Sequence, residues 1–161
     1  ILNTRDLVEI IKKSKKRNFK NKIDVCTKTF QALRMFINQE VSELMIGLVE
    51  ATKLLKIGGK ILVVSFHSIE DKIVKHFFKN FSLDKPNTSR YLPRTNKKNN
   101  ILFEKFNKII KPSKKEINTN PPSRSAKLRY AVRCKNNFEF PNEFFESFKK
   151  YTNLEKVYAK K

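Results

Sequence analysis

The 161-residue sequence predicts an α/β fold, because a long helical pattern, a short apolar strand and a second helix follow one another. Apolar residues recur every three or four positions over residues 30–55, which predicts one or two helices with a break at Asn38. After Gly58 and its neighbouring glycine, residues 61–66 form a continuous apolar run, typical of a strand buried on both faces of a sheet. Apolar spacing resumes over residues 69–81 and predicts the second helix.

A further helix and a basic loop are predicted at the start of the chain. Asn3 is suited to cap this helix, with Asp6 three residues later. The run 12–22 is basic and polar, so we expect it to end that helix in a solvated loop. In the same way, Ser68 followed by Asp71 is typical of an N-cap pair at the start of the helix over residues 69–81.

The region after residue 81 predicts a loop followed by short elements. Residues 82–100 are rich in Pro, Asn, Ser and Lys with little periodicity, which indicates a loop. Residues 101–110 are apolar at several positions and predict either a strand or a short helix. Ser113 with Glu116 predicts one capped helical turn.

A strand and a helix are predicted at the end of the chain. Residues 126–134 alternate with the period of a strand, which would place Lys127 and Arg129 on the exposed face. The alternative reading of these two residues is an edge strand blunted by charge. The tail over residues 136–161 carries phenylalanines at helical spacing, and we expect it to pack on the body or to form a pad between subunits.

The charge of the chain points to a polyanionic partner. There are 36 Lys and Arg against 15 Asp and Glu, a formal charge of +21, and residues 85–133 carry fourteen Lys and Arg against two acids. Five prolines break this stretch, which favours irregular, phosphate-facing loops over a membrane-binding amphipathic helix. No apolar run approaches the length of a membrane span, and a lysine-rich genome is the alternative source of part of the excess.

The cysteines and histidines do not have the spacing of metal ligands. Cys26 and Cys134 lie far apart, and His67 and His76 are not accompanied by a second pair of ligands. We therefore predict no metal site and, by default, a reduced cytoplasmic setting.

Four segments in chain order resemble one family. They are residues 27–34, 58–75, 111–113 and 123–129, and they include the strings SFHSIED and SRSAKLR. Together they resemble the bacterial ribosomal RNA small-subunit methyltransferase H (MraW) family over residues 4–133. The sequence departs from the family pattern before residue 27, where it lacks His-Pro-Ala, and at Pro122, where the family has arginine.

The resemblance implies a C-terminal part of a Rossmann-like class I methyltransferase sheet plus part of a helical insertion. Residues 1–26 would belong to the insertion, residues 27–135 to the methyltransferase domain, and residues 136–161 to the tail. The family transfers a methyl group from S-adenosylmethionine to N4 of a cytidine in small-subunit ribosomal RNA. Its glycine-rich cofactor loop has no counterpart here, so the S-adenosylmethionine site is expected in an N-terminal part that is missing, and this portion alone is expected to be inactive.

The turn after residues 61–66 is the candidate pocket for the target base. Such chemistry lies at the carboxyl ends of strands in open α/β sheets, and the base must leave its stack to be methylated. The pocket candidates are Ser65, Phe66 and His67, with no catalytic base assigned. The alternative is that His67 and Ser68 only cap the following helix and that Phe66 belongs to the core.

Two further stretches are candidates for contacts to RNA phosphates. One flanks the helix after residue 27, where Arg34 offers a guanidinium and Thr29 a hydroxyl that could instead cap the helix. The other precedes and enters the strand over residues 126–134, where Arg124 could instead pair with an acid. The complete set of RNA-binding candidates is Thr29, Arg34, Ser123, Arg124, Lys127 and Arg129.

Three functional readings remain open at this point. The first is the methyltransferase portion, acting on small-subunit ribosomal RNA without a membrane. The second is a noncatalytic basic RNA- or ribosome-binding module, and the third is a peripheral membrane-surface protein. The sequence does not determine the oligomeric state, and a dimer is possible.

Overall fold

The computed structural model describes residues 1–14, 24–83 and 100–158, which form two compact units. One unit comprises Ile1–Ser42 together with Lys150–Lys161, and the other comprises Glu43–Lys149. The predicted basic loop after residue 14 and most of the loop over residues 82–100 lie outside the described residues. None of the described helices is both long and apolar enough to cross a membrane.

The first unit is helical. It contains α1 (Thr4–Ser14), α2 (Thr27–Ile37), the start of α3 (Glu40–Leu54) and the last part of α6 (Asn142–Tyr158). The predicted cap of α1 is confirmed, because the backbone N–H of Asp6 donates to Asn3 Oδ1 at 3.0 Å. The predicted break at Asn38 is also confirmed, since the next residue, Gln39, has a positive φ of 52° that interrupts the helix.

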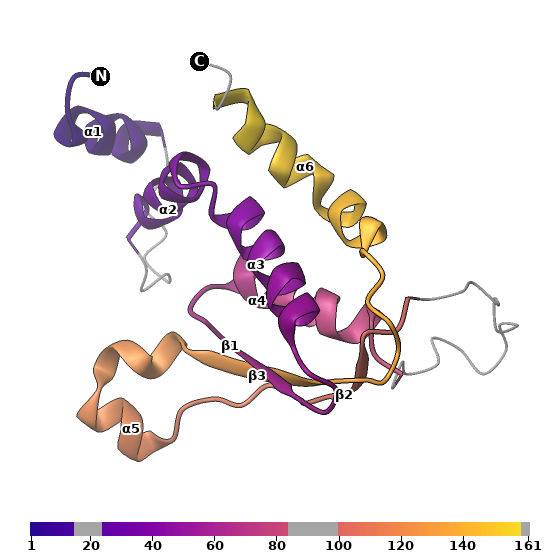
Figure 1. The fold of residues 1–161 in the computed structure, drawn as a ribbon. Coiled ribbons are helices and arrows are strands. Elements are labelled where there is room, and N and C mark those ends of the chain that lie inside the picture. The colour runs from indigo at the N-terminus through magenta and orange to yellow at the C-terminus, as the bar shows by residue number, and fades with distance from the viewer. Residues whose placement is uncertain (15–23, 84–99, 159–161) are drawn as a thin grey trace, which may run out of the picture. The chain divides into compact units, whose positions relative to one another are not determined.

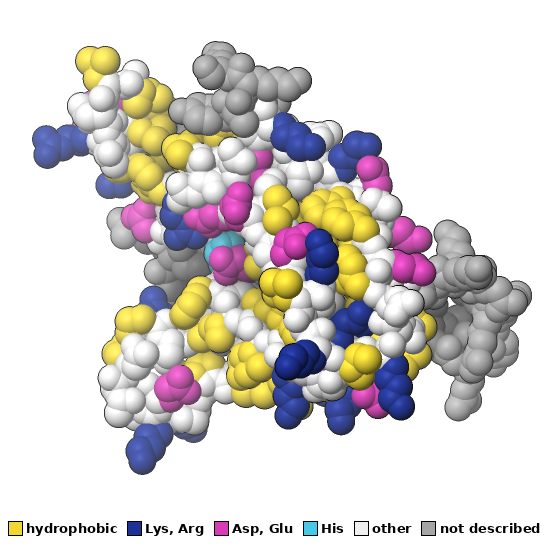
Figure 2. Space-filling model, in the orientation of Figure 1, with side chains coloured by type: hydrophobic (Ala, Val, Ile, Leu, Met, Phe, Trp, Pro, Cys, Tyr) yellow, Lys and Arg dark blue, Asp and Glu magenta, His cyan; other side chains and the backbone are white. Residues whose placement is uncertain are grey.

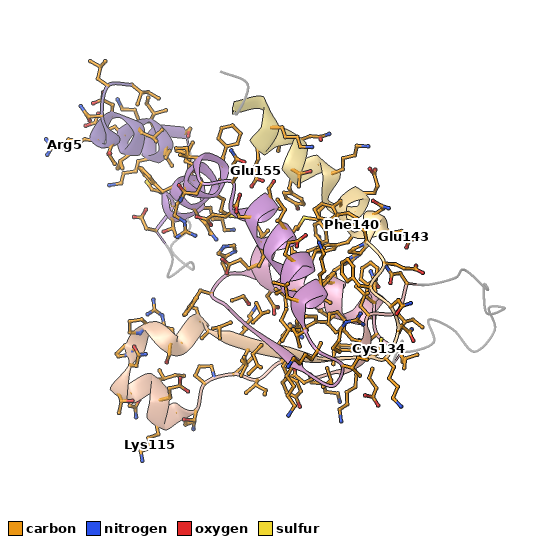
Figure 3. The ribbon with its side chains drawn as sticks, in the orientation of Figure 1. Arg5, Lys115, Cys134, Phe140, Glu143 and Glu155 are labelled. Atoms are coloured by element: carbon orange, nitrogen blue, oxygen red, sulfur yellow. The ribbon has the colours of Figure 1, made fainter. Side chains whose placement is uncertain are left out.

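A buried carboxylate from α6 caps the start of α3. Glu155 is 4% exposed and accepts hydrogen bonds from the backbone N–H groups of Val41 at 3.1 Å and Ser42 at 3.0 Å. The Ser42 hydroxyl donates to the same carboxylate. A negative charge is favourable at this end of a helix, where backbone N–H groups lack partners. Figure 3 shows Glu155 on the side of α6 that faces the beginning of α3.

The second unit contains a three-stranded antiparallel sheet. Its strands are β1 (Lys60–Ser65), β2 (Phe103–Phe106) and β3 (Lys127–Arg133), in the order β1-β3-β2 (Figure 1). The register pairs Lys60 with Val132 and Ser65 with Lys127. The prediction of an α/β class is confirmed, and so is the strand expected over residues 126–134, which pairs antiparallel with β1 and β2.

An aromatic core covers one face of this sheet. The helix α4 (Ser68–Asn80) and the first turns of α6 supply most of its rings. Phe77 lies 4.7 Å from Phe144 and 5.5 Å from Phe103 between ring centroids, and all three side chains are fully buried. The tail therefore packs on the body as a helix, which was one of the two roles expected for it.

The other face of β1 is open among the described residues. The side chains of Leu62 and Val64 are 61% and 54% exposed, so the prediction of a strand buried on both faces is wrong. The reason is that α4 covers the sheet from one side and no described element covers the other.

The turn into β1 requires a glycine, because Gly58 has a φ of 76°.

A basic arm connects β2 to β3. It consists of residues 107–126 and contains α5 (Lys114–Thr119) and the 3-10 helix η1 (Pro121–Ser125). The predicted cap is confirmed, because the backbone N–H of Glu116 donates to Ser113 Oγ at 3.1 Å. Figure 1 shows the arm extending beyond the end of the sheet at which β1 finishes and β3 begins.

Candidate functional site

The candidate site forms where β1 ends and β3 begins. Because the two strands are antiparallel and Ser65 pairs with Lys127, the turn after β1 and the end of the arm meet at the same end of the strands. The hydroxyl of Ser65 donates to the carbonyl oxygen of Lys127 at 3.5 Å. The structure therefore places the SFHSIED and SRSAKLR segments beside each other.

His67 is the N-cap of α4. Its ring Nδ1 accepts from the backbone N–H of Glu70 at 3.4 Å, and its Nε2 lies 3.0 Å from Glu70 Oε1. The Glu70 carboxylate in turn accepts from the backbone N–H groups of Phe66 at 2.9 Å and His67 at 3.3 Å. The prediction of a Ser68–Asp71 cap pair is wrong by one residue, because an imidazole performs the role that a hydroxyl was expected to fill.

The three pocket candidates differ in how far they reach solvent. Ser65 is 3% exposed and bonded to β3, and the His67 side chain is 14% exposed and bonded to Glu70. Phe66 is 57% exposed. Since its backbone is fixed by Glu70, Phe66 presents an aromatic ring to solvent from a well-anchored turn.

Asp71 joins α4 to β3 through two cations. Its Oδ1 accepts from Arg129 Nε at 2.7 Å and its Oδ2 from Lys127 Nζ at 3.3 Å. Burial alone would raise the pKa of Asp71, but the hydrogen bonds and charges of Arg129 and Lys127 outweigh this effect and hold the pKa below its ordinary value.

The expectation that Arg129 lies on the exposed face of its strand is wrong, because its side chain is 8% exposed, while that of Lys127 is 29% exposed. Arg133, on the same side of β3, is 6% exposed. Its guanidinium donates to the carbonyl oxygens of Leu102 at 2.8 Å and Asn136 at 2.9 Å. The basic positions of β3 therefore face inward, because internal acceptors satisfy their charges.

The two candidates on the arm lie in different environments. Ser123 is 5% exposed, and its Oγ has no hydrogen-bond partner among the described residues. Arg124 is exposed, and its guanidinium makes one long contact, 3.4 Å to the carbonyl oxygen of Pro121.

The remaining candidates belong to the helical unit. Arg34 forms a bidentate pair with Glu40, at 2.7 Å and 3.1 Å, and its side chain is 57% exposed. Thr29 lies in the first turn of α2, but it does not cap the helix, since the N-cap is Cys26. The structure thus brings Ser65, Phe66, His67, Ser123, Arg124, Lys127 and Arg129 together in one unit, and leaves Thr29 and Arg34 in the other.

Sequence reasoning did not single out the lysines of the arm. Lys111, Lys114 and Lys115 are all exposed, and Lys115 points away from the sheet at the outer end of the arm (Figure 3). Figure 2 shows Lys and Arg side chains along the lower edge of the visible face and at the end of the arm. The signal available from sequence was the run of cations over residues 105–124, but nothing in it indicated a protruding helical arm.

Comparison with known proteins gives the family. The model of the MraW methylase family matches residues 1–134. The chain belongs to this family. It is 46% identical over 133 residues to the ribosomal RNA small subunit methyltransferase H of Anaplasma phagocytophilum (strain HZ), an alignment that covers 83% of this chain and 40% of that relative. It is 47% identical over 108 residues to the protein of the same name from Hyphomonas neptunium, covering 66% of this chain and 32% of the relative.

The chain corresponds to only part of its relatives, and the family match covers only part of the chain. The chain spans about 40% or less of the length of these relatives. The family match stops at residue 134, so the helix α6 lies beyond it, although Phe144 and Phe148 of α6 are buried in the core.

The described residues do not fit S-adenosylmethionine, the methyl donor that membership of a methylase family implies. The sequence has three glycines, and Gly58 and Gly59 lie in the turn from α3 into β1, not in a turn from a strand into a helix. In the turn from β1 into α4, the backbone N–H groups are occupied by Glu70 and His67. This turn therefore offers no cradle for a cofactor.

Proposed function

We propose that the chain acts as part of an S-adenosylmethionine-dependent methyltransferase that modifies N4 of a cytidine in small-subunit ribosomal RNA. Membership of the MraW methylase family and the printed names of the relatives support this function. The observation that carries the proposal is the adjacency of an exposed aromatic ring, Phe66, and a basic segment at the end of β1.

In this proposal the site contributes one wall of the target-base pocket. Phe66 packs against the extruded base, and the Glu70–His67 capping box fixes the turn that holds this ring. Arg124 and the lysines of the arm contact phosphates on either side of the target nucleotide. Because His67 Nδ1 accepts from the backbone N–H of Glu70 and its Nε2 lies 3.0 Å from Glu70 Oε1, we assign His67 positioning of the turn and not proton transfer.

The domain assignment follows the same proposal. Residues 1–26 belong to a helical insertion, residues 27–135 to the methyltransferase domain, and residues 136–161 form a C-terminal tail. The S-adenosylmethionine site lies in the part of the relatives that this chain does not span, and the protein acts in the cytoplasm.

Binding of RNA by the chain tests the proposal directly. Fluorescence anisotropy with a labelled fragment of small-subunit ribosomal RNA is expected to show binding that weakens steeply as salt rises. Phe66→Ala is expected to weaken binding about 10-fold, since stacking of one base contributes about 1–3 kcal/mol. Phe140→Ala is the matched control, because Phe140 is similarly exposed, at 51%, on the segment before α6. Equal losses in the two variants would contradict the assigned role of Phe66.

A noncatalytic RNA- or ribosome-binding module remains the second candidate. The observation that favours it is the lack of a cofactor cradle in the described turn between β1 and α4. Calorimetry with S-adenosylmethionine is expected to show no binding by this chain under either reading. Transfer of a labelled methyl group to ribosomal RNA, measured after the chain is co-expressed with the remaining part of a relative, distinguishes the two.

A further inference from the structure

Four exposed lysines gather at the end of the sheet opposite the candidate site. They come from three segments that lie far apart in the sequence, and we name them the lysine patch: Lys56, Lys60, Lys105 and Lys135. Lys60 is the first residue of β1, and Lys135 follows β3 by two positions. Because the two strands are antiparallel, the start of β1 lies beside the end of β3. Figure 2 shows Lys and Arg side chains over this end of the sheet.

The strand register places two of these lysines on one face of the sheet. Lys60 and Lys105 both pair with Val132 of the central strand β3. Side chains of directly paired residues project to the same face of a sheet. Neighbouring strands lie about 4.8 Å apart, so the backbones of the two lysines are separated by roughly 10 Å.

The turn that carries Lys56 is held at the same end of the sheet. The carbonyl oxygen of Arg133 accepts from Gly58 N–H at 3.0 Å, and the N–H of Arg133 donates to the Gly59 carbonyl oxygen at 2.9 Å. Within the described residues, no carboxylate forms an ion pair with a lysine of the patch. Four like charges without a neutralising carboxylate repel one another, and a bound polyanion relieves this repulsion.

We propose that the lysine patch is a second binding surface for the phosphate backbone of the ribosomal RNA, separate from the arm and from the turn that carries Phe66. This inference rests on the proposed function, because it extends the contact with the same RNA. A strand rises about 3.3 Å per residue, so the six residues of β1 separate the patch from that turn by roughly 20 Å. One RNA molecule that contacts both ends therefore spans the length of β1. The patch positions the RNA through its phosphates and reads no base sequence.

RNA fits this surface better than an anionic membrane does. A basic protein that lies on a membrane surface uses an amphipathic helix with bulky apolar residues opposite its cations. Here Lys60 and Lys105 project from strands, and Lys56 projects from a turn. The patch also belongs to the same compact unit as Phe66 and the arm, which lets one RNA contact all three surfaces.

Removal of charge from the patch tests the proposal. The patch variant replaces Lys56, Lys60, Lys105 and Lys135 by glutamine, and fluorescence anisotropy measures its affinity for a labelled fragment of small-subunit ribosomal RNA. We expect binding to weaken about 10-fold and the slope of log affinity against log salt to fall by about 2–3. The matched control replaces four other exposed lysines, Lys12, Lys13, Lys149 and Lys150, by glutamine and is expected to lose less affinity. Circular dichroism verifies that both variants remain folded.

A tethered probe gives a second measurement that does not depend on charge. An iron chelate attached to the thiol of Lys105→Cys generates hydroxyl radicals that cleave nearby RNA. Cys26 and Cys134 are buried, so labelling selects the introduced thiol. We expect this probe to cleave the bound RNA, and the same probe at Lys149→Cys, on the exposed side of α6, to cleave it less.

The two measurements can overturn the proposal without overturning the proposed function. A patch variant that loses no more affinity than the control, or a probe at Lys105→Cys that cleaves no RNA, would overturn it. So would a patch variant that keeps its RNA affinity but no longer binds vesicles containing phosphatidylglycerol. Phe66→Ala is measured alongside: if only Phe66→Ala weakens binding, the patch inference fails and the proposed function stands, whereas the reverse result removes the base pocket and keeps the patch. When one RNA contacts both ends, the combined variant is expected to lose the product of the two fold-changes.

Discussion

The strand β3 and the arm that precedes it are both basic, yet their cations have opposite roles. On β3, Arg129 bonds to Asp71, and Arg133 bonds to backbone carbonyl groups in the interior. On the arm, Lys114 and Lys115 are exposed, and Arg124 makes one long contact. On β3, the formal charge therefore overstates the number of cations that can contact RNA. On the arm, the charged side chains are exposed and can contact RNA.

This difference gives a physical rule for the site. A guanidinium enters the interior where carboxylate or carbonyl oxygens satisfy its N–H groups, and it is then committed to the fold. A lysine on the short helix of the arm has no such acceptor, so its charge can bind a polyanion such as RNA. Substitutions on β3 should therefore change stability, and substitutions on the arm should change RNA affinity.

The largest expected effect is on stability at Arg133. Arg133→Ala leaves the carbonyl groups of Leu102 and Asn136 without donors in the interior, and we expect a loss of about 3 kcal/mol in the free energy of unfolding. Urea denaturation followed by circular dichroism measures this loss. Arg124→Ala, the exposed control, is expected to change stability by less than about 0.5 kcal/mol. Equal losses at the two positions would remove the distinction between β3 and the arm.

A somewhat smaller loss of stability is expected at Arg129, together with a dependence on acid pH. Arg129→Ala leaves Asp71 with Lys127 alone, and we expect a loss of about 2 kcal/mol, less than for a fully buried pair because Asp71 is partly exposed.

The pKa of Asp71 is lower in the folded chain than in the unfolded one, so its contribution to stability is present above about pH 4 and is lost as the pH falls through the folded value. Denaturation curves between pH 6 and pH 3 measure this contribution. Asp71→Asn should flatten the acid part of the profile; a profile identical to wild type would contradict the ion pair.

The arm is expected to affect RNA binding with little change in stability. Replacing Lys111, Lys114, Lys115 and Arg124 by glutamine should weaken binding about 10- to 100-fold and reduce the slope of log affinity against log salt by about 2–3. Anisotropy titrations at several salt concentrations measure both quantities.

A matched control removes the same number of positive charges elsewhere. The control variant replaces the exposed residues Lys12, Lys13, Lys149 and Lys150 by glutamine. It is expected to lose less affinity than the arm variant. If the two variants behave alike, binding depends on total charge and not on the arm.

The smallest expected effect concerns His76, outside both basic regions. Burial lowers the pKa of His76, and the charge of Lys72 lowers it further. The folded chain therefore favours neutral His76, and stability should fall as the pH drops below about 6.5, the unfolded value. Thermal unfolding at pH 7.5 and pH 5.5 checks this direction. His76→Gln should make the difference smaller, and an unchanged difference would assign it to another group.

Helix caps and periodic apolar segments could be predicted from the sequence because they depend on local interactions. Asn3 and Ser113 cap their helices as expected, and the break at Asn38 falls where periodicity weakens. The cap of α4 is His67, so the alternative in which His67 caps this helix is confirmed, whereas the Ser68–Asp71 cap pair is one residue too late.

The direction in which a strand side chain points could not be predicted where it depends on distant partners. Alternation over residues 126–134 gave the strand, but basic residues were assigned to the solvent face by hydrophobicity alone. Asp71, 58 positions before Arg129, reverses that assignment. The exposure of Leu62 and Val64 could not be predicted from the local sequence pattern either, because burial of a strand face depends on the elements that cover it.

Through the carboxylate of Glu155, the last helix contributes to the stability of the fold. It satisfies the first backbone amides of α3 from a position 21 residues past the point at which the family match stops. Truncation at residue 134 would leave those amides without an acceptor and would strip Phe144 and Phe148 from the rings around Phe77. The end of the family match is therefore not a safe place to shorten this polypeptide, and a version ending there is expected to aggregate.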